Sequence, residues 1–268
     1  MPQDHKCGTV WDLSLCDYAY TRAFSTAGWA WEFLRRNETY QHEYNLHKST
    51  CPRPSAHISG AQVFDLNQRP ITAEKWGLVF YCDPLKTALQ SSPLWLPTLL
   101  KSVAFCEARK ANVKDEEHLS LASFCGQRTV LVYEKHEVIV IERANKCACL
   151  IVTDGSFLTG NCALKFHHCG LKSAARHFET LKILTQLTKE SAAAAVPIST
   201  FDSKYRDYLV ALDGRLAGRS YRDIAEVLYG PDRVGSHWTD DTWGLKSKVR
   251  RAVECGLALM NGGYRDLL

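Results

Sequence analysis

The chain has 268 residues, with 33 Lys and Arg against 29 Asp and Glu, a formal net charge of +4. Hydrophobic residues make up 46% and charged residues 23%, which are the proportions of a globular protein and exclude a disordered chain. So small a positive charge neither requires nor excludes a nucleic-acid partner, and only local clusters of cations can decide.

The absence of long apolar runs argues against a membrane protein. No run approaches the roughly 18 residues that a membrane helix needs, and the polar N-terminus shows no secretory signal. We therefore expect a soluble, cytoplasmic protein with no membrane partner. The eleven cysteines should then be reduced thiols, and most of them lie among apolar neighbours, where a thiol behaves as a small hydrophobic group.

The N-terminal part is predicted to begin with one long helix over residues 27–47. Trp29, Phe33, Arg36 and Tyr40 fall at helical spacing, and two prolines in Cys51–Ser55 end the pattern. Residues 55–72 look irregular, and a short strand is expected at Gly77–Cys82. Trp29, Trp31, Trp76 and Trp95 are typical of a core or an oligomer interface, although a ligand or base-stacking surface is the alternative.

Three Val- and Ile-rich runs in the middle of the chain predict strands. The runs are 129–133, 137–142 and 147–153, and connectors of about three residues between them favour an antiparallel meander. A helix follows over 171–190. The alanine-rich segment 191–197, which ends at Pro197, is the best candidate for a linker. The fold class is therefore α+β, with an N-terminal domain over residues 1–190 that mixes helices with an antiparallel sheet and serves oligomerisation or regulation.

Residues 200–268 predict a helical, helix-turn-helix-like domain of three helices. The first has apolar residues from Tyr205 to Leu216 and stops at Gly218; the second opens at Ser220, a good N-cap residue, with Asp223 in the capping-box position. Gly230 ends the second helix. The third is expected to open between Thr239 and Asp241 and to run to about Met260. The segment 230–238 between them is longer than the turn of the simplest helix-turn-helix.

The third helix is predicted to be apolar on one side and cationic on the other. At 100° per residue, its inner face holds Val249, Val253, Gly256 and Met260. Four cations lie within the six residues from Lys246 to Arg251, and Lys246 is at the border of the inner face. A helix fits the major groove of DNA, which its N-terminal half commonly reads. A basic helix face is more often only solvated surface, however, and residues 200–268 hold 11 Lys and Arg against 10 Asp and Glu.

The C-terminal sequence also resembles a known family. The run Leu212–Ala225, followed by Leu228-Tyr229-Gly230 and by Gly262–Leu268, resembles the DNA-binding domain of the RovC-like transcription factors. That family includes an activator of type VI secretion genes and regulators of the excision of integrative conjugative elements. Residues 29–40 and 76–80, with Asp83-Pro84, resemble the region that often precedes this domain.

The resemblance implies a bacterial regulator that binds double-stranded promoter DNA and is more often an activator, acting as a homo-oligomer, either a dimer or a higher assembly such as a hexamer. RNA polymerase is a further candidate partner. Some relatives instead act as anti-activators through protein contacts, and this alternative stays open. The helical periodicity, not the resemblance, selects the candidate DNA-binding residues, which are Lys246, Ser247, Lys248, Arg250 and Arg251 on the third helix and Arg219 and Arg222 at the second.

Other chemistry is less well supported by the sequence. Cys147, Cys149 and Cys162, with His167, His168 and Cys169, supply enough ligands for zinc, but a Cys-x-Cys pair on a strand is not the usual structural-site spacing. No phosphate-binding glycine loop and no nucleophile elbow is present. We therefore expect no metal, no cofactor and no enzymatic activity.

Overall fold

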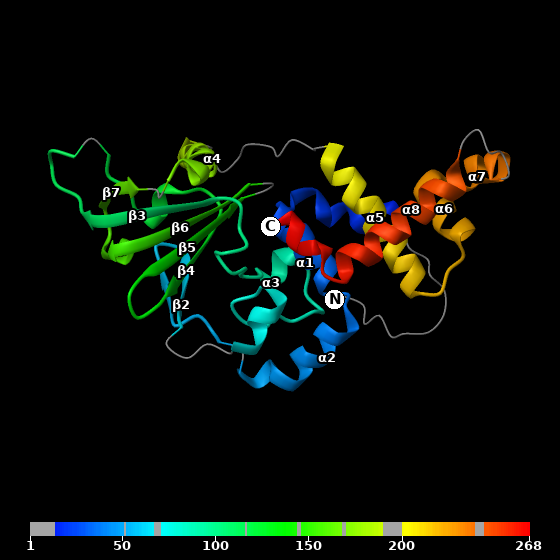
Figure 1. The fold of residues 1–268 in the computed structure, drawn as a ribbon, viewed down its shortest axis with the longest axis horizontal. Helices are drawn as coiled ribbons and strands as arrows, with labels where there is room; N and C mark the ends of the chain where they lie inside the picture. Colours follow the sequence, from blue (N-terminus) through cyan, green and yellow to red (C-terminus); the bar gives the residue numbers. More distant parts are fainter. Residues whose placement is uncertain are drawn as a thin grey trace. The chain divides into compact units, whose positions relative to one another are not determined.

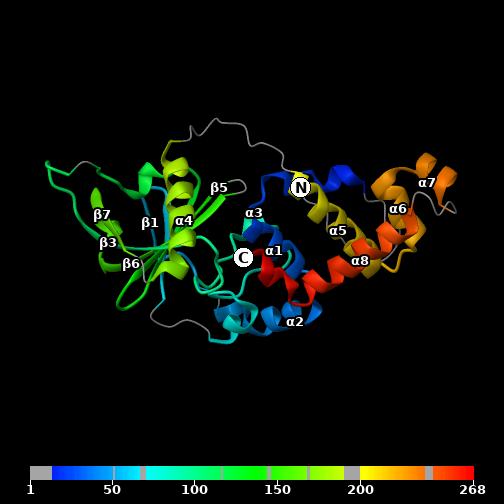
Figure 2. The same ribbon diagram turned by 45° about the horizontal axis from the view of Figure 1, so that its top comes forward.

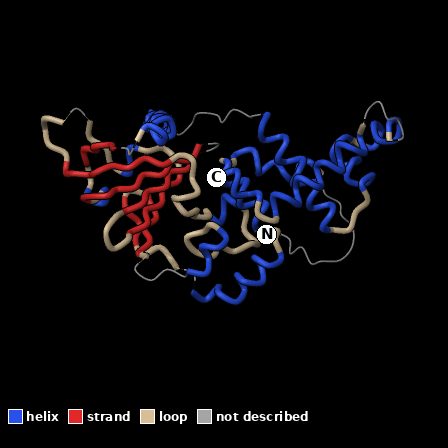
Figure 3. Tube along the Cα trace, viewed as in Figure 1, coloured by secondary structure: helices blue, strands red, loops and turns tan. Residues whose placement is uncertain are grey.

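The computed structural model describes residues 14–50, 52–66, 71–115, 117–143, 146–167, 170–189, 200–238 and 244–268. The chain folds as two compact units (Figures 1 and 3). One unit contains the described sheet and comprises Ala23–Pro197 and Gly262–Leu268; the other is helical and comprises the segment up to Arg22 together with Ile198–Asn261. The predicted α+β class and the helical C-terminal region are confirmed.

The sheet unit is organised around seven described strands in the order β1-β2-β4-β5-β6-β3-β7. Their bounds are β1 (Ala56–Ile58), β2 (Ala61–Asp65), β3 (Val103–Lys110), β4 (Gln127–Val132), β5 (Glu137–Arg143), β6 (Lys146–Gly155) and β7 (Cys162–His167). The predicted meander is confirmed, since β4, β5 and β6 pair antiparallel in sequence. The pairs β2–β4 and β3–β6 are parallel, so the sheet as a whole is mixed.

Both faces of this sheet are covered over its centre. On one face Cys106, Leu150 and Val152 pack with Leu184 and Leu187 of α4 (Leu171–Lys189), the helix predicted at 171–190, which lies across the strands in Figure 2. Alternate residues point to the other face, where Leu131, Val138 and Cys149 are also buried. Strands buried on both faces are apolar along their length, and this explains the Val- and Ile-rich runs.

Short helices from the N-terminal part complete the sheet unit. They are α1 (Thr26–Leu34), α2 (Glu38–His47) and α3 (Ala88–Ser91). The Ser25 hydroxyl accepts a hydrogen bond from the Gly28 N–H at 3.1 Å and so begins α1. Trp29, Trp31 and Trp95 are buried in the core, as predicted, whereas Trp76 is half-buried.

Three predictions for this region are wrong. The helix over 27–47 is interrupted at residues 35–37, because the side chain of Asn37 accepts a hydrogen bond from the Tyr40 N–H and starts a second helix. Gly77–Cys82 is not a strand, because Gly77 has a positive φ of 77° and only Leu78 makes a bridge, to Trp95. Residues 55–72, expected to be irregular, contain the β1–β2 hairpin.

The helical unit consists of a 3-10 helix (Leu15–Ala23) and four described α-helices. These are α5 (Thr200–Leu216), α6 (Tyr221–Tyr229), α7 (Pro231–His237) and α8 (Leu245–Met260). The Tyr18 hydroxyl donates to a carboxylate oxygen of Asp213 in α5 at 2.8 Å, so the N-terminal segment joins this unit. The capping box of Ser220 and Asp223 forms as predicted. The segment after Gly230, predicted to be a long turn, is instead mostly helix α7.

The last residues of the chain belong to the sheet unit. A short 3-10 helix (Gly263–Leu267) follows α8, and the Tyr264 side chain is fully buried beside Trp95, with ring centroids 5.7 Å apart. The linker predicted at 191–197 lies outside the described residues, and the domain boundaries at 190 and 200 remain a prediction.

None of the described helices combines the length and apolar character that a membrane span requires.

Candidate nucleic-acid interface

Helix α8 is held firmly by its apolar side. Val249, Val253, Gly256 and Met260 are buried as predicted, and Val249 and Val253 share a core with Ile224 of α6. A methyl group added at Gly256 would lie 2.7 Å from the carbonyl oxygen of Tyr208. Only glycine therefore allows α8 to approach the backbone of α5 this closely.

The opposite side of α8 presents the predicted cations to solvent. Lys246, Ser247, Lys248, Arg250 and Arg251 are all exposed. Arg250 has an acidic neighbour, Glu254, with Nε and Oε1 3.6 Å apart and both side chains 65% exposed. Within the part of the chain that the structure describes, no acid forms an ion pair with Lys246, Lys248 or Arg251. The N-terminal half of α8 thus carries cations that remain available to an external anion.

The two arginines predicted at α6 have different surroundings. Arg222 is exposed and forms an ion pair with Glu226 one turn later, at 3.3 Å. Arg219 precedes the N-cap residue Ser220 and is half-buried, and its Nε is buried without a hydrogen-bond partner. Such a group costs free energy unless a partner satisfies it. Both residues belong to the same helical unit as α8. Arg219 lies in the loop before α6, and Arg222 lies in the first turn of α6.

A further cation lies on α5, and the sequence patterns did not indicate it. The Nζ of Lys204 lies 5.6 Å from the centre of the Tyr208 ring. Burial raises the pKa of Tyr208 to about 12, while the positive charge of Arg251 acts in the opposite direction. Arg251 and Lys204 therefore both lie near Tyr208. The cation–π contact is a tertiary feature, so only the spacing of Lys204 and Tyr208 along α5 hints at it.

The start of α8 differs from the expectation. The helix begins at Leu245, after Gly244 in the left-handed conformation (φ 54°), with no side-chain cap. Residues 239–243, where an acidic first turn was expected, lie outside the described residues. The first described turn of α8 contains no acid. The basic residues Lys246 and Lys248 lie in this N-terminal part of the helix instead.

The cysteine cluster considered for zinc is dispersed over the sheet. Cys147 and Cys149 lie on β6, and burial raises the pKa of both thiols, that of Cys149 to about 12. The Sγ of Cys162 donates to the carbonyl oxygen of Ser156 at 3.4 Å. His168 and Cys169 lie outside the described residues. Among the residues that the structure describes, no group of three or more His, Cys, Asp or Glu side chains is placed to hold a metal ion.

Comparison with family models identifies the two ends of the chain. A model described as the DNA-binding domain of a type VI secretion system transcription factor, RovC_DNA-bd, matches residues 166–268. The chain carries a RovC-type DNA-binding domain. A second model, of a proteobacterial transcriptional regulator-like domain, matches residues 14–81. No curated protein and no solved structure matches the chain.

The RovC-type domain includes every predicted DNA-binding residue, and the matched region begins before α4. Together the two matches show a transcriptional regulator with a DNA-binding domain. The matches name domains and not individual base or phosphate contacts. The residues that touch DNA are therefore chosen on the geometry of α8.

Proposed function

We propose that this regulator binds double-stranded promoter DNA through the N-terminal half of α8 and activates type VI secretion or mobile-element genes. Lys248, Arg250 and Arg251 would line the major groove or its phosphates, and Lys246 and Ser247 would contact the backbone beside it. The observation that carries the proposal is the exposed cationic face of the N-terminal half of α8, a helix whose other side is buried in a core. A helix of about 10–12 Å diameter fits the major groove.

Two further groups of contacts are proposed at the edge of this surface. Arg219 and Arg222 would hold the phosphate backbone near α6 through the accessible parts of their guanidinium groups. Lys204 would extend the basic surface along α5. Arginine binds phosphate with two parallel hydrogen bonds, so these contacts position the domain without reading sequence.

A homo-oligomer is part of the proposal because one helix reads only a short site. Two or more modules that act together give the affinity and the half-site spacing of typical regulators. We propose a dimer or a larger assembly. RNA polymerase is the partner through which promoter-bound protein would activate transcription.

The test is a DNA-binding titration of the full chain and a triple variant, Lys248→Ala, Arg250→Ala and Arg251→Ala. The DNA is the region upstream of the neighbouring genes, after footprinting has located the site. We expect the variant to lose specific binding while its circular dichroism spectrum is unchanged. Each lost phosphate contact should also reduce the salt dependence by about 0.9 log units per decade.

A matched control removes the same charge elsewhere. Lys110→Ala, Lys114→Ala and Lys135→Ala replace three exposed cations of the sheet unit outside the matched DNA-binding domain and should leave DNA binding nearly unchanged. If both triple variants lost DNA affinity equally, the loss would be an effect of net charge and not of the α8 surface. Unchanged binding in the α8 variant would refute the assignment of this helix. An anti-activator would instead form a stable complex with another regulator and would retard no DNA at moderate salt.

A further inference from the structure

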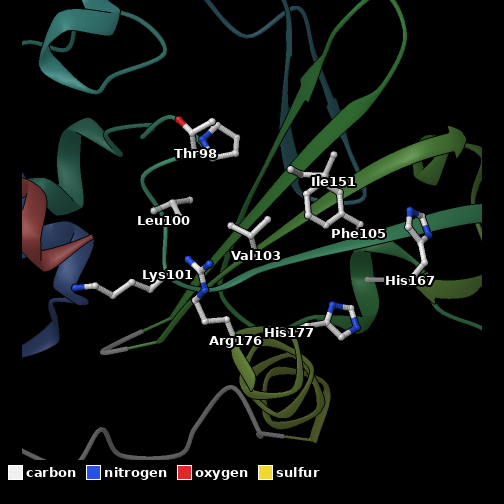
Figure 4. A pocket seen from close by; sticks show the side chains of 10 residues that line it. Thr98, Leu100, Lys101, Val103, Phe105, Ile151, His167, Arg176 and His177 are labelled. Atoms are coloured by element: carbon white, nitrogen blue, oxygen red, sulfur yellow. The ribbon is translucent and has the colours of Figure 1, made fainter. Parts of the chain in front are cut away.

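A cavity of about 420 Å³ opens in the sheet unit between β3, α4 and the segment that precedes β3 (Figure 4). Its volume lies within the range of small-molecule sites. All of its lining residues belong to the sheet unit, and none is among the residues proposed to bind DNA. The cavity is therefore a separate feature that the DNA-binding surface does not explain.

The apolar floor of the cavity is built by the pairing of strands. Phe105 on β3 pairs with Ile151 on β6 and with His167 on β7, so the three side chains form one row across the same face of the sheet. Val103, two residues before Phe105 on β3, points to the same face of the sheet. Phe105 is 41% exposed, although this sheet face is buried at Leu131, Val138 and Cys149. A large aromatic ring thus remains available for contact.

The polar side chains that line the cavity are either cationic or neutral hydrogen-bonding groups. Arg176 of α4 and Lys101 also line the cavity. Helix α4 packs on the sheet face opposite to Phe105, and in Figure 4 the Arg176 side chain extends from α4 toward Val103 at the start of β3, whereas the Lys101 side chain points away from Val103. The Lys101 ammonium donates to the backbone carbonyl of Asp266, an acceptor that does not neutralise it. The lining contains no carboxylate, and no described acid forms an ion pair with Arg176 or Lys101.

His167 supplies a second, independent indication of a ligand. Its Nδ1 is buried and has no hydrogen-bond partner, while its Nε2 lies 3.5 Å from the Thr153 hydroxyl. A buried ring nitrogen without a hydrogen-bond partner costs free energy, and a polar ligand atom that reached Nδ1 would remove that cost. The imidazole also lies beside Phe105, with ring centroids 6.3 Å apart, so it joins the apolar floor to the polar wall.

We propose that this cavity binds a small organic acid with a flat apolar body. The body would lie on Phe105, Val103 and Ile151, and the carboxylate would accept hydrogen bonds from the Arg176 guanidinium, with Lys101 adding charge. Arginine matches a carboxylate through two parallel N–H donors, whereas a neutral ligand would leave the guanidinium without that partner. The proposal is independent of DNA binding, because it concerns other residues and is measured without DNA.

The test compares two probes of one shape, naphthoate and naphthalenemethanol, by titration calorimetry with the full chain in the absence of DNA. We expect wild type to bind the acid about tenfold or more tightly than the alcohol, as one charge-assisted hydrogen-bond pair allows. Arg176→Met keeps an apolar stem and removes the guanidinium, so it should abolish this preference. Lys182→Met is the matched control, because Lys182 is an exposed cation of the same helix outside the lining.

A second variant tests the floor. Phe105 is partly exposed, so Phe105→Ala should fold normally and weaken both probes by a similar factor. Three results would overturn the proposal: no binding of naphthoate in the millimolar range, equal binding of both probes by wild type, or wild-type affinity in both Arg176→Met and Phe105→Ala. A loss of DNA binding in the α8 variant, or its absence, has no bearing on these outcomes.

Discussion

Two Arg-Arg pairs in this protein each have a glutamate three and four residues away, in reversed order, and their surroundings are opposite. Arg35 and Arg36 follow Glu32, and Arg250 and Arg251 precede Glu254, so each pair has a glutamate at helical spacing. Glu32 is completely buried, and its Oε2 accepts hydrogen bonds from the Arg35 Nε at 2.6 Å and the Arg36 Nη1 at 2.9 Å. Glu254 and Arg250 are 65% exposed and 3.6 Å apart.

The difference shows that burial of the acid decides what an arginine pair does. The Oε1 of Glu32 also accepts the backbone N–H of Ala88 at 3.0 Å, so the first pair belongs to a closed network that ties α1 to α3. In the second pair Arg250 forms an exposed ion pair, which contributes little to stability, and Arg251 forms none with the acids that the structure describes. Arg250 remains free to exchange Glu254 for a phosphate.

The largest expected effect comes from removing the two glutamates in turn. Glu32→Ala removes the carboxylate that pairs with two partly buried guanidinium groups and accepts one buried N–H, so we expect a loss of about 3–5 kcal/mol in the free energy of unfolding. Glu254→Ala should change it by about 0.5 kcal/mol or less. Urea denaturation followed by circular dichroism measures both values. Similar losses in the two variants would break the comparison.

A smaller effect is expected from two helical glycines. Gly256→Ala places a methyl group against the backbone of Tyr208 and should cost about 1–3 kcal/mol. It should also weaken DNA binding, because it displaces the helix that presents the cations. Gly235 in α7 has open space at the same position, and Gly235→Ala should stabilise the helix by up to about 1 kcal/mol. Thermal unfolding and the DNA titration together distinguish a displaced α8 from a merely weakened fold.

The buried glutamate also predicts a dependence on pH. Burial by itself raises the pKa of Glu32, but the charges and hydrogen bonds of Arg36 and Arg35 outweigh it and hold the pKa below its ordinary value of 4.5. The network therefore stabilises the fold fully above that value and loses its contribution as the pH falls through the lower, folded-state pKa. In Glu32→Gln the acid-induced loss of unfolding free energy should be smaller than in wild type. Parallel pH profiles of the two proteins would contradict this assignment.

The smallest expected effect concerns the exposed pair. Glu254→Gln removes the acid that competes with a phosphate for Arg250, so the affinity for DNA should rise by about twofold to fivefold, the equivalent of one exposed ion pair. The gain should shrink as salt increases. Fluorescence anisotropy at two salt concentrations measures it. A lower affinity in this variant would mean that Glu254 itself contributes to the complex.

Local patterns predicted a large part of this fold, but not its long-range pairings. The β4–β6 meander, α4 and α6 follow from periodicity and capping residues alone. Strands β3 and β7 escaped prediction because β3 is fixed by a parallel partner, β6, more than 35 residues away along the chain. The break between α1 and α2 depends on one side chain, since Asn37 caps the second helix against an otherwise continuous helical pattern.

The candidate site shows the same limit. Exposure of Lys246, Lys248, Arg250 and Arg251 follows from the helical period, because the buried residues of α8 fix the direction of the rest. Three features needed coordinates: the contact of Lys204 with Tyr208, the partnerless Nε of Arg219, and α7 in place of a turn. Each depends on residues brought together by tertiary packing, which spacing along one helix does not specify.

The chain passes between the two units more than once, and this affects how the protein can be dissected. A fragment that begins near residue 200 would lose Tyr18, the donor to Asp213, and would separate Tyr264 from Trp95, beside which it is buried. The tyrosine and leucines at its C-terminal end, which are buried in the intact protein, would be exposed and would favour self-association of the fragment. If such a C-terminal fragment failed to bind DNA, the cause could be its lost tertiary contacts and not a lack of DNA-binding residues. Point substitutions in the intact polypeptide are therefore the better way to locate its DNA contacts.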